Sequence, residues 1–216
     1  MNLRYDVFNA ERLKGASFVG AYEFPALRGI KLDSIPSRIV GLDKLTARNC
    51  DECLVHGYVE DYKYGRIYTR SPKYLMLLKR AKVVIGLDHS AYRDLPLTEQ
   101  IHSMYLNRAT DYWWQQEGVR VIPNISCADE RSYAFCCDGI ERGTTIAMSS
   151  FGHKRRDLDK RYFIEGVRVV IQKLSPHSIL LHGAIPTEVQ AIADYYHVQI
   201  IHIPTRLELA HSGKAA

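Results

Sequence analysis

Short aliphatic runs alternate with longer amphipathic segments along most of the chain. The runs KVVIGLD, VRVIPNIS, TTIAMSS, HSILLHG and VQIIHIPTR start at residues 82, 119, 144, 177 and 198, and CLVHGYVEDY lies nearer the start, at residues 53–62. Brief runs rich in valine and isoleucine, bounded by Gly, Pro, Asn or Ser, are typical of buried β-strands. The pattern therefore predicts strands in these six places.

The segments between the strands carry apolar residues at helical spacing. Gly118 is a natural stop for one helix, Pro176 follows the end of the next, and Pro72 suits the start of a helix in SPKYLMLLKRA. The spacing predicts helices over residues 71–81, 97–118, 157–174 and 187–197.

Alternating strands and helices indicate βα units around a parallel sheet. About six units are too few for a complete barrel of eight. We predict an α/β protein in which alternating βα units form an irregular or incomplete (β/α) barrel-like single domain; an open doubly wound parallel sheet is the alternative. We expect residues 1–35 to form an N-terminal arm packed on the domain, residues 36–208 the single α/β domain, and residues 209–216 a disordered tail.

Composition and charge limit the class of protein, its partners and its cellular compartment. A chain of 216 residues, 46% of them hydrophobic, can bury one sizeable core. Its net charge of +5 favours anionic partners such as phosphates or nucleic acid. No apolar run approaches the roughly 20 residues of a spanning helix, and the opening MNLRYDVFNAERLKG lacks the apolar core of a secretory signal. We therefore expect a cytoplasmic protein with reduced cysteines and no membrane association.

Polar side chains follow the predicted strands at the ends where parallel α/β folds bind ligands. Asp88, His89 and Ser90 come directly after KVVIGL. Two carboxylates from adjacent strands, Asp61 and Asp88, have the oxygens to bind a divalent metal or to divide acid and base work. The candidate catalytic residues are Asp61, Asp88, His89 and Asp129, the candidate metal ligands are Asp61 and Asp88, and further pocket candidates are Ser90, Asn124 and His182. Ordinary turns also place polar residues at strand ends, and that interpretation stays open.

The segment SSFGHKRRDLDKR, at residues 149–161, carries the clearest signal for an anion. Hydroxyls, a glycine and clustered cations precede a predicted helix, whose free N–H groups also attract phosphate. The candidate phosphate-binding residues are Ser149, Ser150, Lys154, Arg155 and Arg156. The segment lacks the spacing of a P-loop or of a dinucleotide fold, and the alternative is a solvated basic turn with Asp157 as helix cap.

Cysteines and aromatic residues give weaker signals. Cys50, Cys53 and His56 have the spacing of half a zinc site, although core thiols are the alternative. Tyr112, Trp113 and Trp114 are consecutive on a predicted helix, so we expect at least one to face outward or toward a partner, and exposed aromatic residues would allow a homo-oligomer. Alternating tyrosines and basic residues over 62–68 predict an extended stretch, either a half-buried edge strand or a clamp for a nucleic-acid strand.

The ordered series GYVEDYKY, KVVIGLDHSAYRDLP, NISCADERSYAFCCDGI and TTIAMSSFG resembles the phage- and plasmid-associated bacterial family called domain of unknown function 4417. The resemblance runs from about Val55 to Gly183, implies a mobile-element setting and brings no established activity. It adds Arg108 and Glu130 to the candidate pocket residues. The positions that it marks are Asp61, Asp88, Ser90, Pro96, Arg108, Trp114, Pro123, Asp129, Glu130, Ser132, Asp138, Gly139, Gly152 and Gly183. The chain departs from the pattern at Leu87 and His89, where a proline and an aromatic residue are expected.

Taken together, these features predict a phage or mobile-element protein that binds a nucleic acid or a phosphorylated nucleotide at the strand carboxyl ends. If the protein is an enzyme, we expect metal-assisted phosphodiester or nucleotide chemistry with a divalent metal as cofactor. The alternative is a non-catalytic binding or accessory protein, such as a replication accessory or a factor that sequesters a host protein or a signalling nucleotide.

Overall fold

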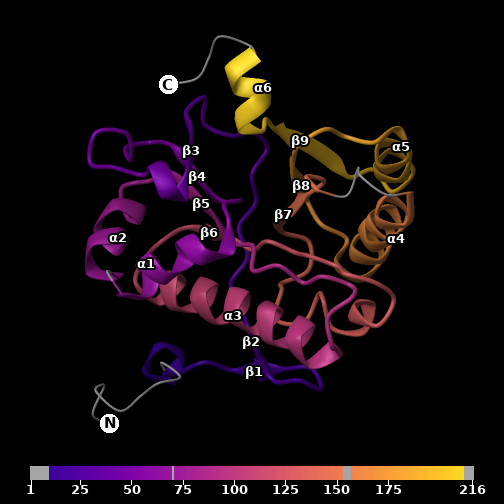
Figure 1. The fold of residues 1–216 in the computed structure, drawn as a ribbon, viewed down its shortest axis with the longest axis horizontal. Helices are drawn as coiled ribbons and strands as arrows, with labels where there is room; N and C mark the ends of the chain where they lie inside the picture. The colour runs from indigo at the N-terminus through magenta and orange to yellow at the C-terminus, as the bar shows by residue number, and fades with distance from the viewer. Residues whose placement is uncertain (1–9, 70, 153–156, 212–216) are drawn as a thin grey trace.

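The structure is a computed structural model that describes residues 10–69, 71–152 and 157–211. One parallel sheet has four strands in the order β3 (Ile39–Gly41), β4 (Leu54–Gly57), β5 (Val83–Leu87) and β6 (Val121–Ile122). A second parallel sheet has three strands in the order β7 (Thr145–Ser149), β8 (Ser178–His182) and β9 (Gln199–Ile203). Figure 1 shows the two sheets on either side of the centre of the molecule.

A narrow junction joins the two sheets just after β6. Asn124 forms an isolated parallel bridge with Ala147 of β7. The Ile125 amide donates to the Ala147 carbonyl at 2.8 Å, and the Ala147 amide donates to the Pro123 carbonyl at 2.9 Å. The strands of both sheets therefore follow chain order through this junction.

The inner faces of both sheets share one buried core. Successive side chains of a strand point to opposite faces, so Leu54 of β4 points inward and Val55 points outward. The inward-facing buried side chains are Leu54, Val83, Ile85, Ile122, Ala147, Leu180 and Ile203. This shared core holds the two sheets together where hydrogen bonds are few.

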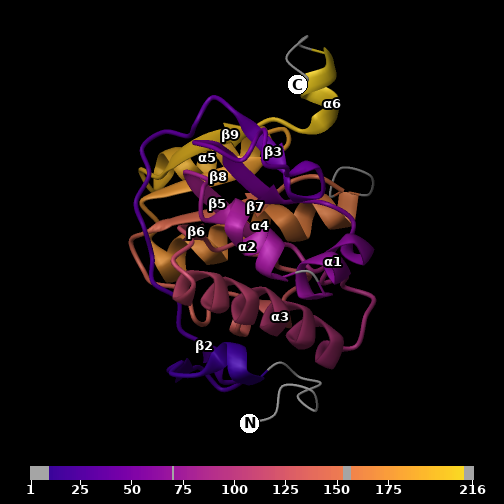
Figure 2. The ribbon, with the colours of Figure 1, turned by 90° about the vertical axis from the view of Figure 1, so that its left-hand side faces the viewer.

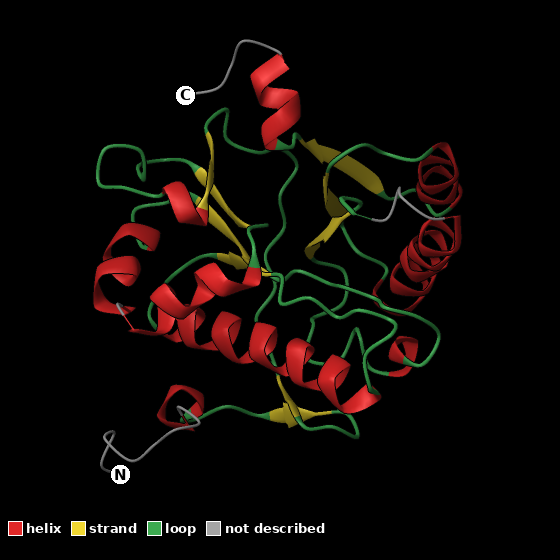
Figure 3. Cartoon of the chain, viewed as in Figure 1, coloured by secondary structure: helices red, strands yellow, loops and turns green. Residues whose placement is uncertain are grey.

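The helices cover the outer faces of the sheets. Figures 1 and 3 show α1 (Gly65–Thr69) and α2 (Ser71–Leu78) beside the four-stranded sheet, and α4 (Asp157–Leu174) and α5 (Thr187–Tyr195) beside the three-stranded sheet. The long helix α3 (Leu97–Gln116) contacts β5 and β6. Outward-facing strand residues pack against these helices in two further buried clusters.

The predicted α/β class is confirmed, and the predicted strands and helices are present. Two details differ from expectation. The irregular or incomplete barrel is not shown, because the described strands pair as two parallel sheets, and neither sheet reverses its strand order as a doubly wound sheet does. In addition, the predicted extended stretch at 62–68 is wrong, because a 3₁₀ helix, η4 (Asp61–Tyr64), runs directly into α1 there and buries Tyr64 and Ile67.

The arm crosses the end of the molecule that lies opposite α6 (Arg206–His211), as Figures 1 and 2 show. It contains a 3₁₀ helix, η2 (Ala10–Leu13), and a hairpin of β1 (Phe18–Val19) and β2 (Phe24–Pro25). Phe24 packs against Phe135, and the Thr145 amide donates to the Ile30 carbonyl at 2.8 Å. These contacts tie the arm to the second sheet.

The two tryptophans are not available for an oligomer contact. Trp113 is 8% exposed and Trp114 is 0% exposed, so the prediction that one faces outward is wrong. Tyr112 is buried as well, at 6% exposed. Both tryptophans pack in the buried cluster on the outer face of the four-stranded sheet, and the arm also places the Arg12 guanidinium over the Trp113 ring, 4.2 Å from its centroid.

At the other end of the chain, α6 extends to His211, so residues 209–211 of the expected tail are helical. Thr205 and Glu208 form a capping box: the Thr205 amide donates to Glu208 Oε2 at 2.7 Å, and the Glu208 amide donates to Thr205 Oγ1 at 3.3 Å. Among the described residues, no helix is both long enough and apolar enough to span a membrane.

Candidate functional site

A cavity of about 730 Å³ opens at the carboxyl ends of the strands. Residues at or just after the ends of β4, β5, β6, β7, β8 and β9 all contribute to its wall. The polar and charged residues that line it are His56, Tyr58, Glu60, Asp61, Tyr62, Asp88, Ser90, Tyr92, Ser126, Ser149, His182, Thr205 and Arg206. Polar side chains thus lie together at the strand carboxyl ends, as predicted.

Asp88 lies half-buried in the cavity wall, at the end of β5. The Asn124 amide donates to Asp88 Oδ1 at 2.7 Å, and the Tyr58 hydroxyl donates to Asn124 Oδ1 at 2.9 Å. Burial raises the pKa of Asp88 to about 6, although the Asn124 hydrogen bond partly opposes that rise. A carboxyl group that titrates near neutral pH beside a cavity is a frequent feature of functional sites.

Asp61 begins η4 and faces the same cavity. Its Oδ2 accepts from the Ser90 amide at 3.0 Å and its Oδ1 accepts from the Ser90 hydroxyl at 3.1 Å. The structure therefore brings Asp61, Asp88 and Ser90 together as expected. Within the described part of the chain, however, no group of three or more His, Cys, Asp and Glu side chains is placed to hold a metal ion.

His182, at the end of β8, stacks on Tyr58 in the wall of the cavity. The two rings are 4.3 Å apart with an angle of 12° between their planes. His182 Nδ1 lies 3.0 Å from Ser149 Oγ. Burial lowers the pKa of His182 to about 4 and that of His56 to about 3, so both rings are neutral at pH 7.

Charge is unevenly distributed around the cavity. Glu60 pairs with Lys63, and Arg206 pairs with Asp43, so these charges are largely compensated. Asp61 and Asp88 have no such cationic partner among the described residues. The side formed by β4 and β5 is therefore acidic, whereas hydroxyl groups and a glycine line the side formed by β7.

Three large aromatic side chains stand exposed at the rim of this cavity. Tyr62 is 80% exposed, and Tyr92 and Phe151 are each 62% exposed. Exposed rings around one concave polar site offer flat surfaces for a ligand.

Several predicted catalytic residues lie elsewhere. His89 points away from the cavity wall: its Nε2 lies 3.1 Å from the Tyr68 hydroxyl, and its ring meets the edge of Tyr64. Asp129 pairs with Arg131 at 2.7 Å and stabilises the turn before a 3₁₀ helix, η5 (Ser132–Ala134). Neither belongs to the cavity lining, so an acidic centre that includes Asp129 is not formed.

The other predicted residues lie either outside the cavity lining or outside the described residues. Arg108 is buried and donates to three backbone carbonyls, those of Asn124, Cys136 and Asp138, which is a structural role. Ser150 donates to the Ala184 carbonyl at 2.7 Å, and neither it nor the exposed Glu130 lines the cavity. The predicted phosphate-binding residues Lys154, Arg155 and Arg156 lie outside the described residues.

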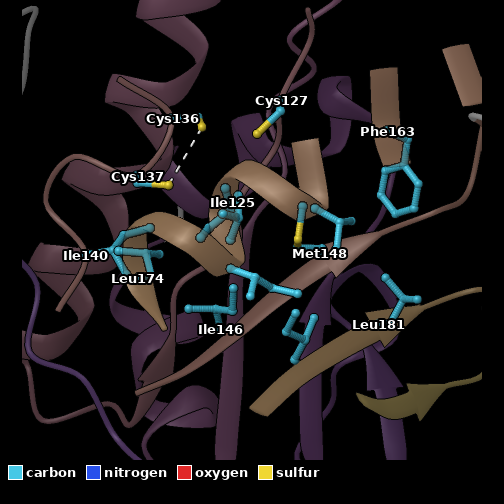
Figure 4. Close-up of a cluster of buried hydrophobic side chains, with 14 of the residues drawn as sticks. Ile125, Cys127, Cys136, Cys137, Ile140, Ile146, Met148, Phe163, Leu174 and Leu181 are labelled. Carbon is cyan, nitrogen blue, oxygen red and sulfur yellow. Dashed lines mark hydrogen bonds between the residues drawn. The ribbon is translucent and has the colours of Figure 1, made fainter. Parts of the chain in front are cut away.

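The cysteines are buried core residues. Cys53 Sγ donates to the Cys50 carbonyl at 3.3 Å, and burial raises the pKa of the Cys53 thiol to about 11. His56 faces the cavity instead of these thiols. Figure 4 shows Cys127, Cys136 and Cys137 among hydrophobic side chains, with the sulfurs of the last two 3.8 Å apart. All five are free thiols, which agrees with the core alternative.

The sequence reasoning missed Tyr58, Phe151 and Arg206 as cavity residues. All three follow strand ends within a few positions, as the predicted residues do. Their positions just after predicted strands could have identified these aromatic and basic side chains as cavity residues.

The fold and the cavity define a parallel α/β protein with a polar, partly acidic ligand cavity at the strand carboxyl ends. The model of the family described as domain of unknown function (DUF4417) matches residues 16–202. The chain belongs to this family.

Two relatives are proteins of mycobacterial phages. The Gene 1 protein of Mycobacterium phage L5 is 28% identical over 183 residues, which cover 83% of this chain and 78% of the phage protein. The Gene 1 protein of Mycobacterium phage D29 is 25% identical over 183 residues, which cover 83% of this chain and 66% of the phage protein, just under two thirds of its length. No solved structure is significantly similar to this chain.

Proposed function

We propose that this protein binds a nucleotide, free or as one unit of a single-stranded nucleic acid, in the cavity at the strand carboxyl ends. The observation that carries the proposal is the convergence of six strand ends on one cavity of about 730 Å³. That volume falls in the range of roughly 300–1,000 Å³ typical of small-molecule sites. Hydroxyl, imidazole and carboxyl groups in its wall supply the few polar contacts that orient such a ligand.

The uneven charge of the cavity orients the nucleotide. The carboxylates of Asp61 and Asp88 repel phosphate, so the phosphate lies away from them, toward the exposed Gly152. In the sequence, Lys154, Arg155 and Arg156 follow Gly152 almost directly, which adds positive charge to that segment. The base then lies on the acidic side, beside Asp88.

The exposed rings at the rim support a flat ligand. Base stacking on an aromatic side chain contributes roughly 1–3 kcal/mol per base and tolerates any base. Tyr62 is the most exposed of the rim rings, and Tyr195 is a matched control because it is 76% exposed and does not line the cavity.

Calorimetric titration of the full chain with mononucleotides and with short single-stranded DNA and RNA tests the proposal. We expect binding, and we expect Tyr62→Ala to weaken it roughly tenfold while Tyr195→Ala has no effect. The absence of binding to every nucleotide and oligonucleotide, or an equal loss in both variants, contradicts the proposal.

A second candidate function is metal-assisted phosphodiester or nucleotide chemistry, favoured by the presence of Asp61 and Asp88 on one cavity wall. Phosphate oxygens of a bound ligand would supply the further ligands that a divalent cation needs. Turnover that requires Mg²⁺ or Mn²⁺ and disappears in Asp61→Asn supports this candidate. Binding that survives in EDTA without turnover supports a non-catalytic binding protein.

A further inference from the structure

We propose that the cavity selects guanine, whose paired N–H donors are read by the Asp88 carboxylate. This inference rests on the nucleotide-binding function proposed above and names the base that the site prefers.

The first step concerns the hydrogen bonds of the Asp88 carboxylate. The side-chain amide of Asn124 has a donor NH₂ group and an acceptor oxygen. The Tyr58 hydroxyl donates to the oxygen, so the NH₂ group of Asn124 faces Asp88. Asn124 is the one described side chain that hydrogen-bonds the Asp88 carboxylate. A carboxylate has about four acceptor sites, so most of the acceptor capacity of Asp88, which lines the cavity, is not used by the described side chains.

The second step is the contrast with Asp61. Each of its oxygens already accepts a hydrogen bond from Ser90. Asp61 is also exposed, whereas Asp88 is half-buried. Asp88 is therefore the carboxylate that is equipped to bind a ligand directly.

The third step is the surroundings of Asp88 on the inner side. Asp88 also lines a recess of about 30 Å³, whose other lining residues include the buried Ile125 and Met148 and the serines Ser126 and Ser149. Hydrogen bonds to a carboxylate are stronger where water is scarce. The recess has room for one water molecule or one amino group and is too small for a ring, so the amino group of a base is the part of the ligand that fits it.

The fourth step is the chemistry of the bases. Guanine presents two adjacent donors, a ring N–H and an amino group, which match the two oxygens of one carboxylate. Adenine and cytosine present one donor next to an acceptor, and uracil presents one donor between two acceptors. An acceptor placed against an ionised carboxylate is repelled, so Asp88 favours guanine and disfavours the other bases.

The test is calorimetric titration of the full chain with GMP, IMP, AMP and CMP at pH 7.5. We expect GMP to bind roughly tenfold more tightly than IMP, which lacks the amino group, and more tightly still than AMP and CMP. In Asp88→Asn, which replaces an acceptor by a donor, we expect the preference for GMP to disappear, whereas Asp194→Asn, at an exposed carboxylate that does not line the cavity, keeps it. Circular dichroism and thermal melting establish that both variants fold.

Two negative outcomes have different meanings. If the four nucleotides bind with equal affinity to wild type and Asp88→Asn protein, the guanine inference is overturned and Asp88 does not read the base. If no nucleotide binds to the wild type, the proposed function itself fails. Loss of GMP binding as the pH falls through about 6, absent in Asp88→Asn, supports Asp88 as the acceptor.

Discussion

The rings of Tyr58 and His182 stack 4.3 Å apart, although one follows a strand of the four-stranded sheet and the other ends a strand of the three-stranded sheet. Both residues line the cavity. Tyr58 also donates to Asn124, which in turn donates to Asp88. Contacts from both sheets therefore fix the position of the groups that we propose to bind ligand.

Removal of the Tyr58 hydroxyl tests this chain of hydrogen bonds. Tyr58→Phe keeps the ring but leaves the buried Asn124 carbonyl without its donor, so we expect a loss of about 1–3 kcal/mol in the free energy of unfolding. Urea denaturation measures this change. The control is Tyr195→Phe, at an exposed ring, which leaves stability unaltered; an unchanged midpoint for both variants contradicts the role given to Tyr58.

Asp88 gives stability a specific dependence on pH. Its pKa of about 6 in the folded protein exceeds the unfolded value of 3.8, so the folded state binds the proton more tightly. The contribution of Asp88 to stability is thus largest below pH 4, declines as the pH rises to 6, and is constant above that. Asp88→Asn removes this decline. Urea denaturation of both proteins between pH 4 and 7 isolates it, and parallel stability curves contradict the assignment.

Gly86 of β5 lies against a buried acid of α3. A Cβ atom at this position would lie 2.3 Å from Oδ1 and 2.5 Å from Oδ2 of Asp111. Both Asp111 oxygens are buried without a hydrogen-bond partner in the described structure, and burial raises the pKa of Asp111 well above its usual value. We expect Gly86→Ala to destabilise the fold by about 1–3 kcal/mol through overpacking.

The control for this prediction is Gly65→Ala, because a Cβ atom there meets nothing within 4 Å and the φ of −50° suits alanine. Thermal unfolding of both variants compares them directly. Equal stability of Gly86→Ala and wild type shows that β5 and α3 can move apart at low cost, contrary to the prediction.

Trp113 is expected to stabilise the fold and not an oligomer. Its side chain is almost fully buried beneath Arg12, so Trp113→Ala should lower the free energy of unfolding by about 3–5 kcal/mol. Light scattering over a range of concentrations should give the same mass for the variant as for the wild type. A smaller mass for the variant would restore Trp113 as an interface residue.

Most of the fold could be predicted from the sequence, because the patterns that indicate strands and helices are local. The aliphatic runs at β5, β7 and β8 and the apolar spacing in α3 and α4 identify elements without knowledge of their neighbours. The separation of the strands into two sheets could not be predicted, because it depends on pairing between segments far apart in the chain. Burial of Trp113 likewise depends on the distant arm.

The site was predictable in part for the same reason. Strand ends converge in any parallel α/β fold, so Asp61, Asp88 and His182 could be assigned to one edge. Side-chain direction beyond a strand end is set by the loop, and there adjacent residues diverge: Asp88 faces the cavity while His89 packs beneath Tyr68. No pattern in the sequence separates these two neighbours.

Asn124 belongs both to the ligand site and to the junction of the sheets. Its side chain holds Asp88, and its backbone forms the bridge to Ala147, flanked by the hydrogen bonds of the Ile125 and Ala147 amides. The ligand that we propose for Asp88 would therefore act, through Asn124, on the backbone bridge that joins the two sheets. We therefore expect that ligand to slow amide hydrogen exchange at Ile125 and Ala147.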